Sequence, residues 1–275
     1  MINSIASEVA ASRRGWAEVN GVALRYELGG SGPSTLVLLH EMGGSIESWD
    51  GLVPLLPAGW RWLRYDQRGF GLSEKPTDIT LDALVDDLVA LLDALALTEP
   101  VVLVGAAVGA AIALDCALRH PQRVAALLLA SPATGGVTPA QREAIESRIE
   151  RVQAQGLRAV TDAMFQVTYP PALRVDGMAT LENHRLRWLA MTPASFAAIN
   201  RMLATFDLES ELHRIACPTR VVGCRHDGVR PPARSAELAA LIPGASYVET
   251  DSGHYLPVQS PALFAALLGE FLARF

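Results

Sequence analysis

Cysteine is scarce in this sequence. The 275 residues include three cysteines, Cys116, Cys217 and Cys224. An odd number of widely spaced cysteines gives neither a disulfide framework nor the paired spacing of a zinc site. We therefore expect reduced core thiols in a cytoplasmic protein. Cys116 lies too far into the helix predicted over residues 110–119 to act as a nucleophile at its start.

Excess positive charge and long apolar runs are also absent. The formal net charge of -6 disfavours nucleic acid or an anionic membrane as a partner. Charged or polar residues interrupt each apolar stretch before it reaches membrane-spanning length. Residues 1–14 lack the basic start, apolar middle and cleavage site of a secretory signal. These features predict a cytoplasmic protein whose partner is a small-molecule substrate.

The most informative absence is a serine hydroxyl. Residues 105–109, Gly-Ala-Ala-Val-Gly, fit the G-x-S-x-G turn that presents a catalytic serine between an apolar strand and a helix, except that Ala107 stands at the serine position. The apolar residues 100–104 precede the turn, and an alanine-rich helix is predicted to follow it. Because a methyl group cannot attack a carbonyl, Ala107 excludes a covalent intermediate at this position.

Short apolar runs alternate with longer amphipathic ones, which predicts an α/β fold with a mostly parallel sheet flanked by helices. The expected strands are residues 22–28, 35–40, 60–65, 100–104, 124–130, 219–223 and 246–250. The expected helices are residues 81–95, 110–119, 233–241 and a last one from residue 261. Between residues 138 and 205 the pattern is helical, with proline breaks at 170, 171 and 193. We therefore predict a core of residues 1–136 and 207–275, with a helical lid of residues 137–206 inserted in it.

Two polar residues follow late strands of the predicted sheet. Asp227 comes just after the apolar run 221–224, and His254 directly follows the last strand. Ligands and chemistry gather at the carboxyl edge of open α/β sheets. Enzymes with this kind of elbow carry nucleophile, acid and base in that chain order. Ala107, Asp227 and His254 therefore predict a catalytic site in which the nucleophile is missing, and His226 is interpreted as incidental.

The segment His40-Glu41-Met42-Gly43-Gly44 follows a buried strand, where an oxyanion-hole loop is expected. We assign the donors as the backbone amides of Met42 and Val108. Each such donor is worth about 3 kcal/mol of transition-state stabilisation. Glu41 is either a second acid/base, if burial raises its pKa, or a residue that points outward or pairs with Arg68.

The predicted lid is rich in bulky apolar and arginine residues. Pockets are mainly apolar with a few polar anchors, so we expect some of these residues to contact the substrate. An arginine there could clamp a substrate carboxylate. The candidate substrate-binding residues are His40, Trp188, Met191 and Arg187, with Arg174 and Arg185 as further candidate clamps.

Several motifs together give a resemblance that covers nearly the whole chain. They are residues 40–44, the run 65–73 (Tyr-Asp-Gln-Arg-Gly-Phe-Gly-Leu-Ser), the elbow, the Asp227 loop and the Gly253-His254 pair. The chain resembles the α/β-hydrolase superfamily, most closely the 3-oxoadipate enol-lactonase group. It is also similar to the aminoacrylate hydrolase of pyrimidine breakdown, whose elbow, as the resemblance suggests, likewise carries alanine. The resemblance implies an α/β-hydrolase fold without metal or organic cofactor. Glu41 departs from it, since glycine commonly follows the histidine of this loop.

Three interpretations of Ala107 remain open. In the first, His254, oriented by Asp227, activates water to hydrolyse a small activated metabolite, such as an enol lactone, ester, enamine or amide. In the second, the alanine is an engineered replacement in a serine hydrolase. In the third, the protein binds a small ligand without catalysis. The fold also hosts lyases and cofactor-free oxygenases that use a His–Asp pair.

Overall fold

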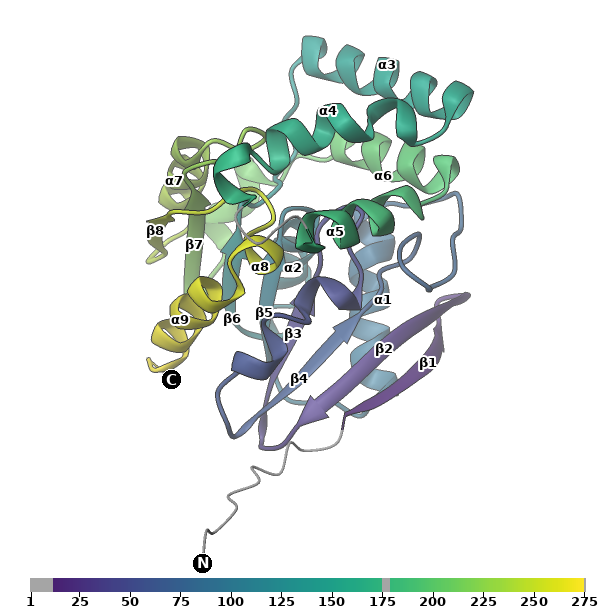
Figure 1. Ribbon diagram of the computed structural model, residues 1–275. Helices are drawn as coiled ribbons and strands as arrows, with labels where there is room; N and C mark the ends of the chain where they lie inside the picture. The colour runs from purple at the N-terminus through teal and green to yellow at the C-terminus, as the bar shows by residue number, and fades with distance from the viewer. Residues whose placement is uncertain (1–11, 175–178, 275) are drawn as a thin grey trace, which may run out of the picture.

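The computed structural model describes residues 12–174 and 179–274. Its eight strands form one sheet in the order β1-β2-β4-β3-β5-β6-β7-β8 (Figure 1). The strands are β1 (Arg13–Val19), β2 (Val22–Gly30), β3 (Ser34–Leu39), β4 (Trp60–Tyr65), β5 (Val101–Ala106), β6 (Val124–Ala130), β7 (Thr219–Cys224) and β8 (Ser246–Thr250). β1 and β2 pair antiparallel, and the ladders from β4 to β8 are parallel. The predicted α/β fold with a mostly parallel sheet is confirmed.

Helices cover both faces of the sheet. The core helices are α1 (Leu81–Ala94), α2 (Val108–Arg119), α7 (Pro232–Leu241), α8 (Leu256–Gln259) and α9 (Pro261–Leu272). Short 3-10 turns are η1 (Ile46–Trp49), η2 (Val53–Leu55), η3 (Pro121–Arg123), η4 (Pro171–Leu173) and η5 (Glu209–Arg214). Residues of α1, α2 and α7 share one hydrophobic cluster, and residues of α9 belong to a second. β3 is apolar from Leu36 to Leu39 because this part of the strand lies between the two clusters: Val37 packs into the first and Leu38 into the second.

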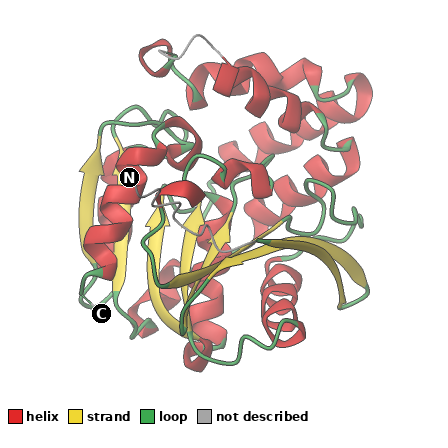
Figure 2. Cartoon of the chain, turned by 60° about the horizontal axis from the view of Figure 1, so that its bottom comes forward, coloured by secondary structure: helices red, strands yellow, loops and turns green. Residues whose placement is uncertain are grey.

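Four further helices lie between β6 and β7 in the sequence. They are α3 (Pro139–Gln155), α4 (Arg158–Thr168), α5 (Ala179–Leu189) and α6 (Pro193–Thr205), and we call them the insertion. α3 packs against both α4 and α6, and α4 packs against α5. Figures 1 and 2 show the insertion as a layer at one end of the sheet. Prolines stand at the first turn of α3 and α6, where their missing N–H leaves no helix bond unmade.

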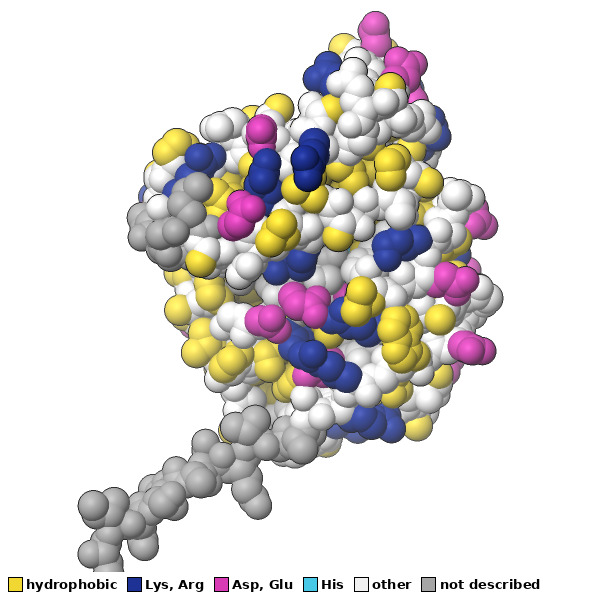
Figure 3. Space-filling model, turned by 45° about the vertical axis from the view of Figure 1, so that its right-hand side comes forward, with side chains coloured by type: hydrophobic (Ala, Val, Ile, Leu, Met, Phe, Trp, Pro, Cys, Tyr) yellow, Lys and Arg dark blue, Asp and Glu magenta, His cyan; other side chains and the backbone are white. Residues whose placement is uncertain are grey.

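Strand β1 was not expected from the sequence. It pairs with β2 over its whole length, from Arg13 opposite Leu28 to Val19 opposite Val22. The prediction that residues 1–14 carry no secretory signal falls mostly on residues 1–11, which lie outside the described residues. Within the described ranges, no helix combines the length and apolarity that crossing a membrane requires. On the face in Figure 3, acidic and basic side chains are intermixed rather than separated by sign.

Candidate active site

The elbow at Ala107 keeps the backbone of a nucleophile-presenting turn. Ala107 lies between β5 and α2 with φ 50° and ψ -109°, a conformation that non-glycine residues rarely adopt. Its N–H donates to the carbonyl of Ala130 (2.9 Å), and its carbonyl accepts from the N–H of Ala133 (3.1 Å). A Cβ at Gly109 would lie 2.0 Å from the carbonyl oxygen of Leu39. Close packing of strand and helix therefore requires glycine there and holds residue 107 in its strained conformation.

Asp227 and His254 form a buried hydrogen-bonded pair. His254 Nδ1 lies 2.8 Å from Asp227 Oδ2. Asp227 Oδ1 accepts from the backbone N–H groups of Val229 (2.8 Å) and Arg230 (2.7 Å). Burial alone would raise the pKa of Asp227, but His254 and the Arg230 amide outweigh it and lower that pKa. Because the ionised carboxylate only accepts, Nδ1 carries the proton and Nε2 of the neutral ring is a base.

The elbow and the His254 ring share one cavity of about 280 Å³. Ala107, Val108, Met42 and His254 all line it, so the structure brings four of the predicted site residues together. The other lining residues come from the insertion and from nearby core loops. They are Ala133, Val137, Gln141, Ala144, Ile145, Arg148, Met164, Asn200, Leu203, Val229, Arg230 and Tyr255.

The cavity lies at the point where the sheet reverses its winding. The chain leaves β3 toward β4 on one side and leaves β5 toward β6 on the other. The loops after β3 and β5 therefore diverge and leave a crevice, which is where open α/β sheets bind ligands. Met42 belongs to the first loop, and Ala107 begins the second.

The loop after β3 fixes the direction of the Met42 amide. The carbonyl oxygen of Glu41 accepts from Gly44 N–H (3.0 Å) and lies 2.7 Å from His40 Nδ1. Because a trans peptide bond points its N–H opposite its C=O, these contacts orient the Met42 N–H as well. The Met42 carbonyl in turn accepts from Trp188 Nε1 at 3.2 Å. Val108 is the first residue of α2, and its N–H has no intrahelical acceptor.

Glu41 is enclosed beneath this loop. Its side chain is fully buried, and Oε1 accepts from Ser48 Oγ at 2.8 Å and contacts His184 Nε2 at 3.3 Å. Burial opposes ionisation, but the interaction with His184 outweighs it and lowers the pKa of Glu41 to about 2. Both alternatives to an acid/base role are wrong: the side chain does not point outward, and Arg68 pairs with Asp87. Glu41 is also not among the residues that line the cavity.

The predicted substrate-binding residues do not line this cavity. His40 is buried, and its Nε2 accepts from the backbone N–H of Gln67 at 3.1 Å. Trp188 lies on α5, and its buried indole packs against the loop after β3 and donates to the Met42 carbonyl. Arg187 and Met191 line a separate hollow of about 520 Å³. The structure therefore does not bring these four candidate substrate-binding residues together at the elbow cavity.

The other two arginines predicted to bind a substrate carboxylate form contacts away from the cavity. Two arginines that were not predicted line the cavity instead. Arg174 donates to the carbonyl of Tyr169, and Arg185 pairs with Asp162. Sequence reasoning missed Arg148 and Arg230, which do line the cavity. Arg230 follows Asp227 by three residues, a local signal, whereas Arg148 depends on how α3 packs.

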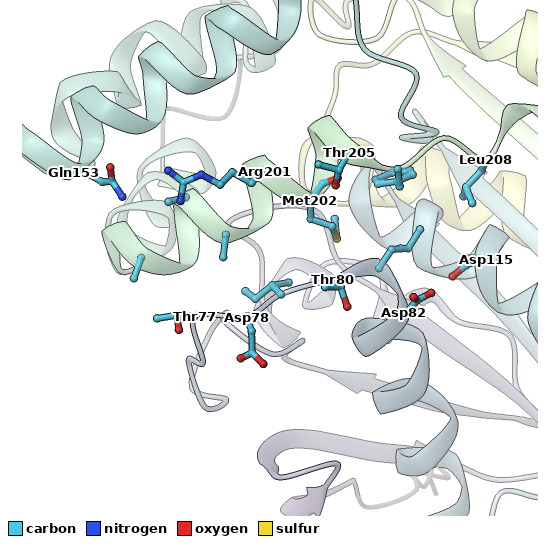
Figure 4. Close-up of a pocket in the computed structure, with 16 residues that line it drawn as sticks. Thr77, Asp78, Thr80, Asp82, Asp115, Gln153, Arg201, Met202, Thr205 and Leu208 are labelled. Atoms are coloured by element: carbon cyan, nitrogen blue, oxygen red, sulfur yellow. The ribbon is translucent and has the colours of Figure 1, made fainter.

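A second cavity, larger than the one at the elbow, lies away from Ala107. It has a volume of about 720 Å³ and lies between the loop that leads into α1 and helix α6 of the insertion (Figure 4). Thr80 and Asp82 line it from the core, and Arg201 and Met202 from α6. It contains neither Ala107 nor His254, so volume alone does not identify the chemical site.

The three cysteines are free thiols. Burial raises the pKa of Cys116 and of Cys224 to about 12, which leaves both protonated and unreactive at neutral pH. Over the described part of the chain, no group of three or more His, Cys, Asp or Glu side chains is arranged to hold a metal ion.

Comparison with known proteins matches this architecture. The chain is 30% identical over 243 residues to a protein named as the carbamate hydrolase RutD from Agrobacterium fabrum, covering 86% of this chain and 92% of that protein. It is 28% identical over 265 residues to the pyrrolizixenacetamide deacetylase of Xenorhabdus hominickii, with coverage of 93% and 96%. The crystal structure of the enol-lactonase from Burkholderia xenovorans LB400 superposes with a TM-score of 0.89 at 27% identity, covering 94% of this chain and all of that one. A family model described as the alpha/beta hydrolase fold matches residues 34–261, and the chain therefore belongs to the α/β-hydrolase fold family.

Proposed function

We propose that this protein hydrolyses a small activated substrate with water as the nucleophile and His254 as the general base. The observation that carries the proposal is the shared cavity. His254, which is hydrogen-bonded to Asp227, lines the same space as Ala107, Met42 and Val108. The water molecule would occupy the position beside Ala107 that a serine oxygen fills in serine hydrolases.

The reaction follows from these groups. Nε2 of His254 takes a proton from water while the water oxygen attacks the carbonyl carbon of the substrate. The carbonyl oxygen gains the negative charge, and the amides of Met42 and Val108 stabilise it. Asp227 stabilises the imidazolium that forms. As the tetrahedral intermediate collapses, His254 returns the proton to the leaving oxygen or nitrogen, and the acid and the alcohol or amine are released.

Support for the substrate class comes from the relatives' names. They describe a carbamate hydrolase, a deacetylase and an enol-lactonase, which cleave C–N or ester-type bonds. Activated members of these classes suit the mechanism, because water attacks without the help of a covalent intermediate. Enol lactones, electron-poor esters and activated amides are such substrates.

We further propose that residues 137–206 act as a lid. α3, α4 and α6 contribute Arg148, Met164, Asn200 and Leu203 to the cavity wall. These helices thus cover the reacting groups from the side opposite the sheet. A cover of this kind excludes bulk water and strengthens the electrostatic interactions beneath it.

Glu41 is proposed to position the loop rather than to exchange protons with substrate. Its carboxylate contacts Ser48 and His184 and does not line the cavity. The acid/base role considered from the sequence requires a raised pKa, whereas the pKa of Glu41 is lowered to about 2. A carboxylate held between the loop and α5 keeps the Met42 peptide in place.

A serine-hydrolase origin is the second candidate, favoured by the φ of 50° at Ala107. Ala107→Ser tests the two directly, with 4-nitrophenyl acetate as the probe ester. For direct water attack, we expect no increase in kcat/KM, because the hydroxyl displaces the attacking water. A rise of about 100-fold or more, with a burst of 4-nitrophenol, would instead identify a serine hydrolase. Absence of turnover in both proteins would favour a binding protein.

A further inference from the structure

The active-site cavity is lined by positively charged side chains and, among the described residues, by no acidic one. Arg148 and Arg230 line it, and among the described lining residues there is neither Asp nor Glu. This contrasts with the chain as a whole, whose formal net charge is -6. Arginines elsewhere in the structure are commonly paired, such as Arg68 with Asp87 at 2.6 Å. The cavity therefore differs in charge from its surroundings.

Arg148 reaches the cavity from α3 of the insertion. Its side-chain partner is a weak acceptor: Nη1 lies 3.3 Å from Met164 Sδ. Its Nε is buried and has no hydrogen-bond partner within the described ranges. Desolvation lowers the pKa of Arg148, and no neighbouring carboxylate offsets that effect. A guanidinium has five N–H donors, so most of the hydrogen-bonding capacity of Arg148 is unused.

Arg230 reaches the same cavity from the core. Its backbone N–H donates to Asp227, which places the residue directly beside the His254–Asp227 pair. Its guanidinium forms no ion pair within 4 Å with any described residue, although Asp227 and Glu209 act on it at longer range. Burial lowers the pKa of Arg230 as well. Desolvation of Arg148 is thus offset by no carboxylate, and desolvation of Arg230 is offset only in part, by Asp227 and Glu209 at longer range.

We propose that Arg148 and Arg230 form a subsite for a carboxylate of the substrate. This inference rests on the proposed hydrolase function and adds the charge of the substrate to it. A planar carboxylate matches the forked donors of arginine and supplies the missing negative charge. The cavity of about 280 Å³ limits the substrate to a small molecule. The substrate class is therefore a short acid that also carries the ester, lactone or C–N bond to be cleaved.

The two arginines belong to different parts of the molecule, which gives the anion a second role. Arg148 lies on the insertion, and Arg230 lies on the loop after β7. Without a ligand, the like charges oppose the approach of these two parts. A bound carboxylate would contact both guanidinium groups and hold the insertion against the core. Binding of the substrate and closure over the His254 ring are thus coupled.

Calorimetric titration with succinate, and with its neutral analogue succinamide, tests the subsite without requiring turnover. We expect the parent protein to bind succinate at least about 10-fold more tightly than succinamide. Arg148→Gln and Arg230→Gln should each weaken succinate binding by about 10- to 100-fold and change succinamide binding less. Arg151→Gln is the matched control, because Arg151 is an exposed arginine on the same helix. It should alter succinate binding by less than about twofold.

A stability measurement separates a ligand-binding role from a structural one. Because neither guanidinium has a carboxylate partner, both glutamine variants should melt at or above the temperature of the parent. Equal affinity for succinate and succinamide in the parent would overturn the proposal. So would a melting temperature that falls in both variants, or tighter binding of inorganic phosphate than of succinate.

Hydrolysis of two esters then separates this inference from the proposed function. The probes are 4-nitrophenyl butyrate and mono(4-nitrophenyl) adipate, which carries a free carboxylate. The ratio of kcat/KM for the charged over the neutral ester should fall at least about 10-fold in each arginine variant. If the parent hydrolyses both esters without preferring the charged one, the carboxylate subsite is contradicted, whereas the proposed hydrolase function is supported. If succinate binding depends on the two arginines but neither ester is hydrolysed, the subsite is supported and the proposed hydrolase function is contradicted.

Discussion

Two buried histidine–carboxylate pairs lie close together in this structure, and they differ in access to substrate. In the first, His254 Nδ1 lies 2.8 Å from Asp227, and the ring borders the active-site cavity. In the second, His184 Nε2 lies 3.3 Å from Glu41, and neither residue borders it. Tyr255 separates them, with its ring 5.1 Å from that of His254 and 4.3 Å from that of His184.

The supporting contacts of the two pairs explain their different roles. Backbone amides hold one oxygen of Asp227, its other oxygen holds the His254 ring, and that ring lines the cavity. The His184 ring is instead packed edge-on against Phe165 and Tyr255. Burial lowers the pKa of His184, which keeps its ring neutral. Under the proposed function, the same two functional groups act on substrate in one place and position a loop in the other.

Removing the imidazole from the cavity should have the largest effect. We expect His254→Ala to lower kcat/KM for 4-nitrophenyl acetate by about 10²- to 10⁴-fold, the usual contribution of a general base. The control is His226→Ala, because His226 pairs with Asp251 away from the cavity. Equal loss of activity in the two variants would contradict the proposal that His254 is the general base.

Removing the carboxylate of the enclosed pair should mainly affect stability. We expect Glu41→Ala to lower the free energy of unfolding by about 1–3 kcal/mol at pH 7, measured by urea titration, because it leaves the buried Ser48 hydroxyl without its acceptor and the buried His184 ring without its neighbouring carboxylate. Since the pKa of Glu41 in the folded state is about 2, below the unfolded value of about 4.3, ionisation stabilises the fold above about pH 5. That contribution declines as the pH falls toward 2.

The pH dependence of stability provides the matched test for Glu41. The difference in unfolding free energy between the parent and Glu41→Gln should be largest at neutral pH and shrink progressively from about pH 5 to about pH 2. A difference that stays constant with pH would contradict an ionised Glu41. A pH–rate profile of Glu41→Gln that loses one limb of the parent profile would instead make Glu41 an acid or base.

A smaller effect should come from the indole that joins α5 to the loop. Trp188 lies one helical turn after His184 and donates to the carbonyl of Met42 at 3.2 Å. Trp188→Phe removes one hydrogen bond, which is worth about 0.5–1.5 kcal/mol. We expect kcat to fall by about 2- to 10-fold with little change in KM, because the Met42 amide acts in the transition state. Trp16→Phe, at an exposed tryptophan, should change neither.

The elements that are buried on both faces were predictable, because their composition leaves few alternatives. The strand expected at 124–130 matches β6, and the strand expected at 60–65 matches β4. The turn at 105–109 was recognisable because its glycines are required by contacts with Leu39 and Ala110. β1 was missed, because an edge strand exposed on much of its surface lacks a continuous apolar run.

Side-chain partners in the insertion could not be predicted from the sequence. The contact of His184 with Glu41 and the approach of Arg148 to the cavity both depend on how each helix is rotated about its axis. Helical periodicity identifies an apolar face, but it does not tell which neighbour that face meets. Arg187 was favoured over Arg148 for this reason, although Arg187 lies by a different hollow.

The backbone at residue 107 has an evolutionary consequence. Its positive φ aims the side chain at the cavity whatever that side chain is. Alanine and serine codons differ by a single base, and the base, the acid and the anion-stabilising amides would meet the new hydroxyl already in place. Under the proposed mechanism, passage between water-mediated and covalent catalysis on this scaffold therefore takes one mutational step and leaves the surrounding architecture unchanged.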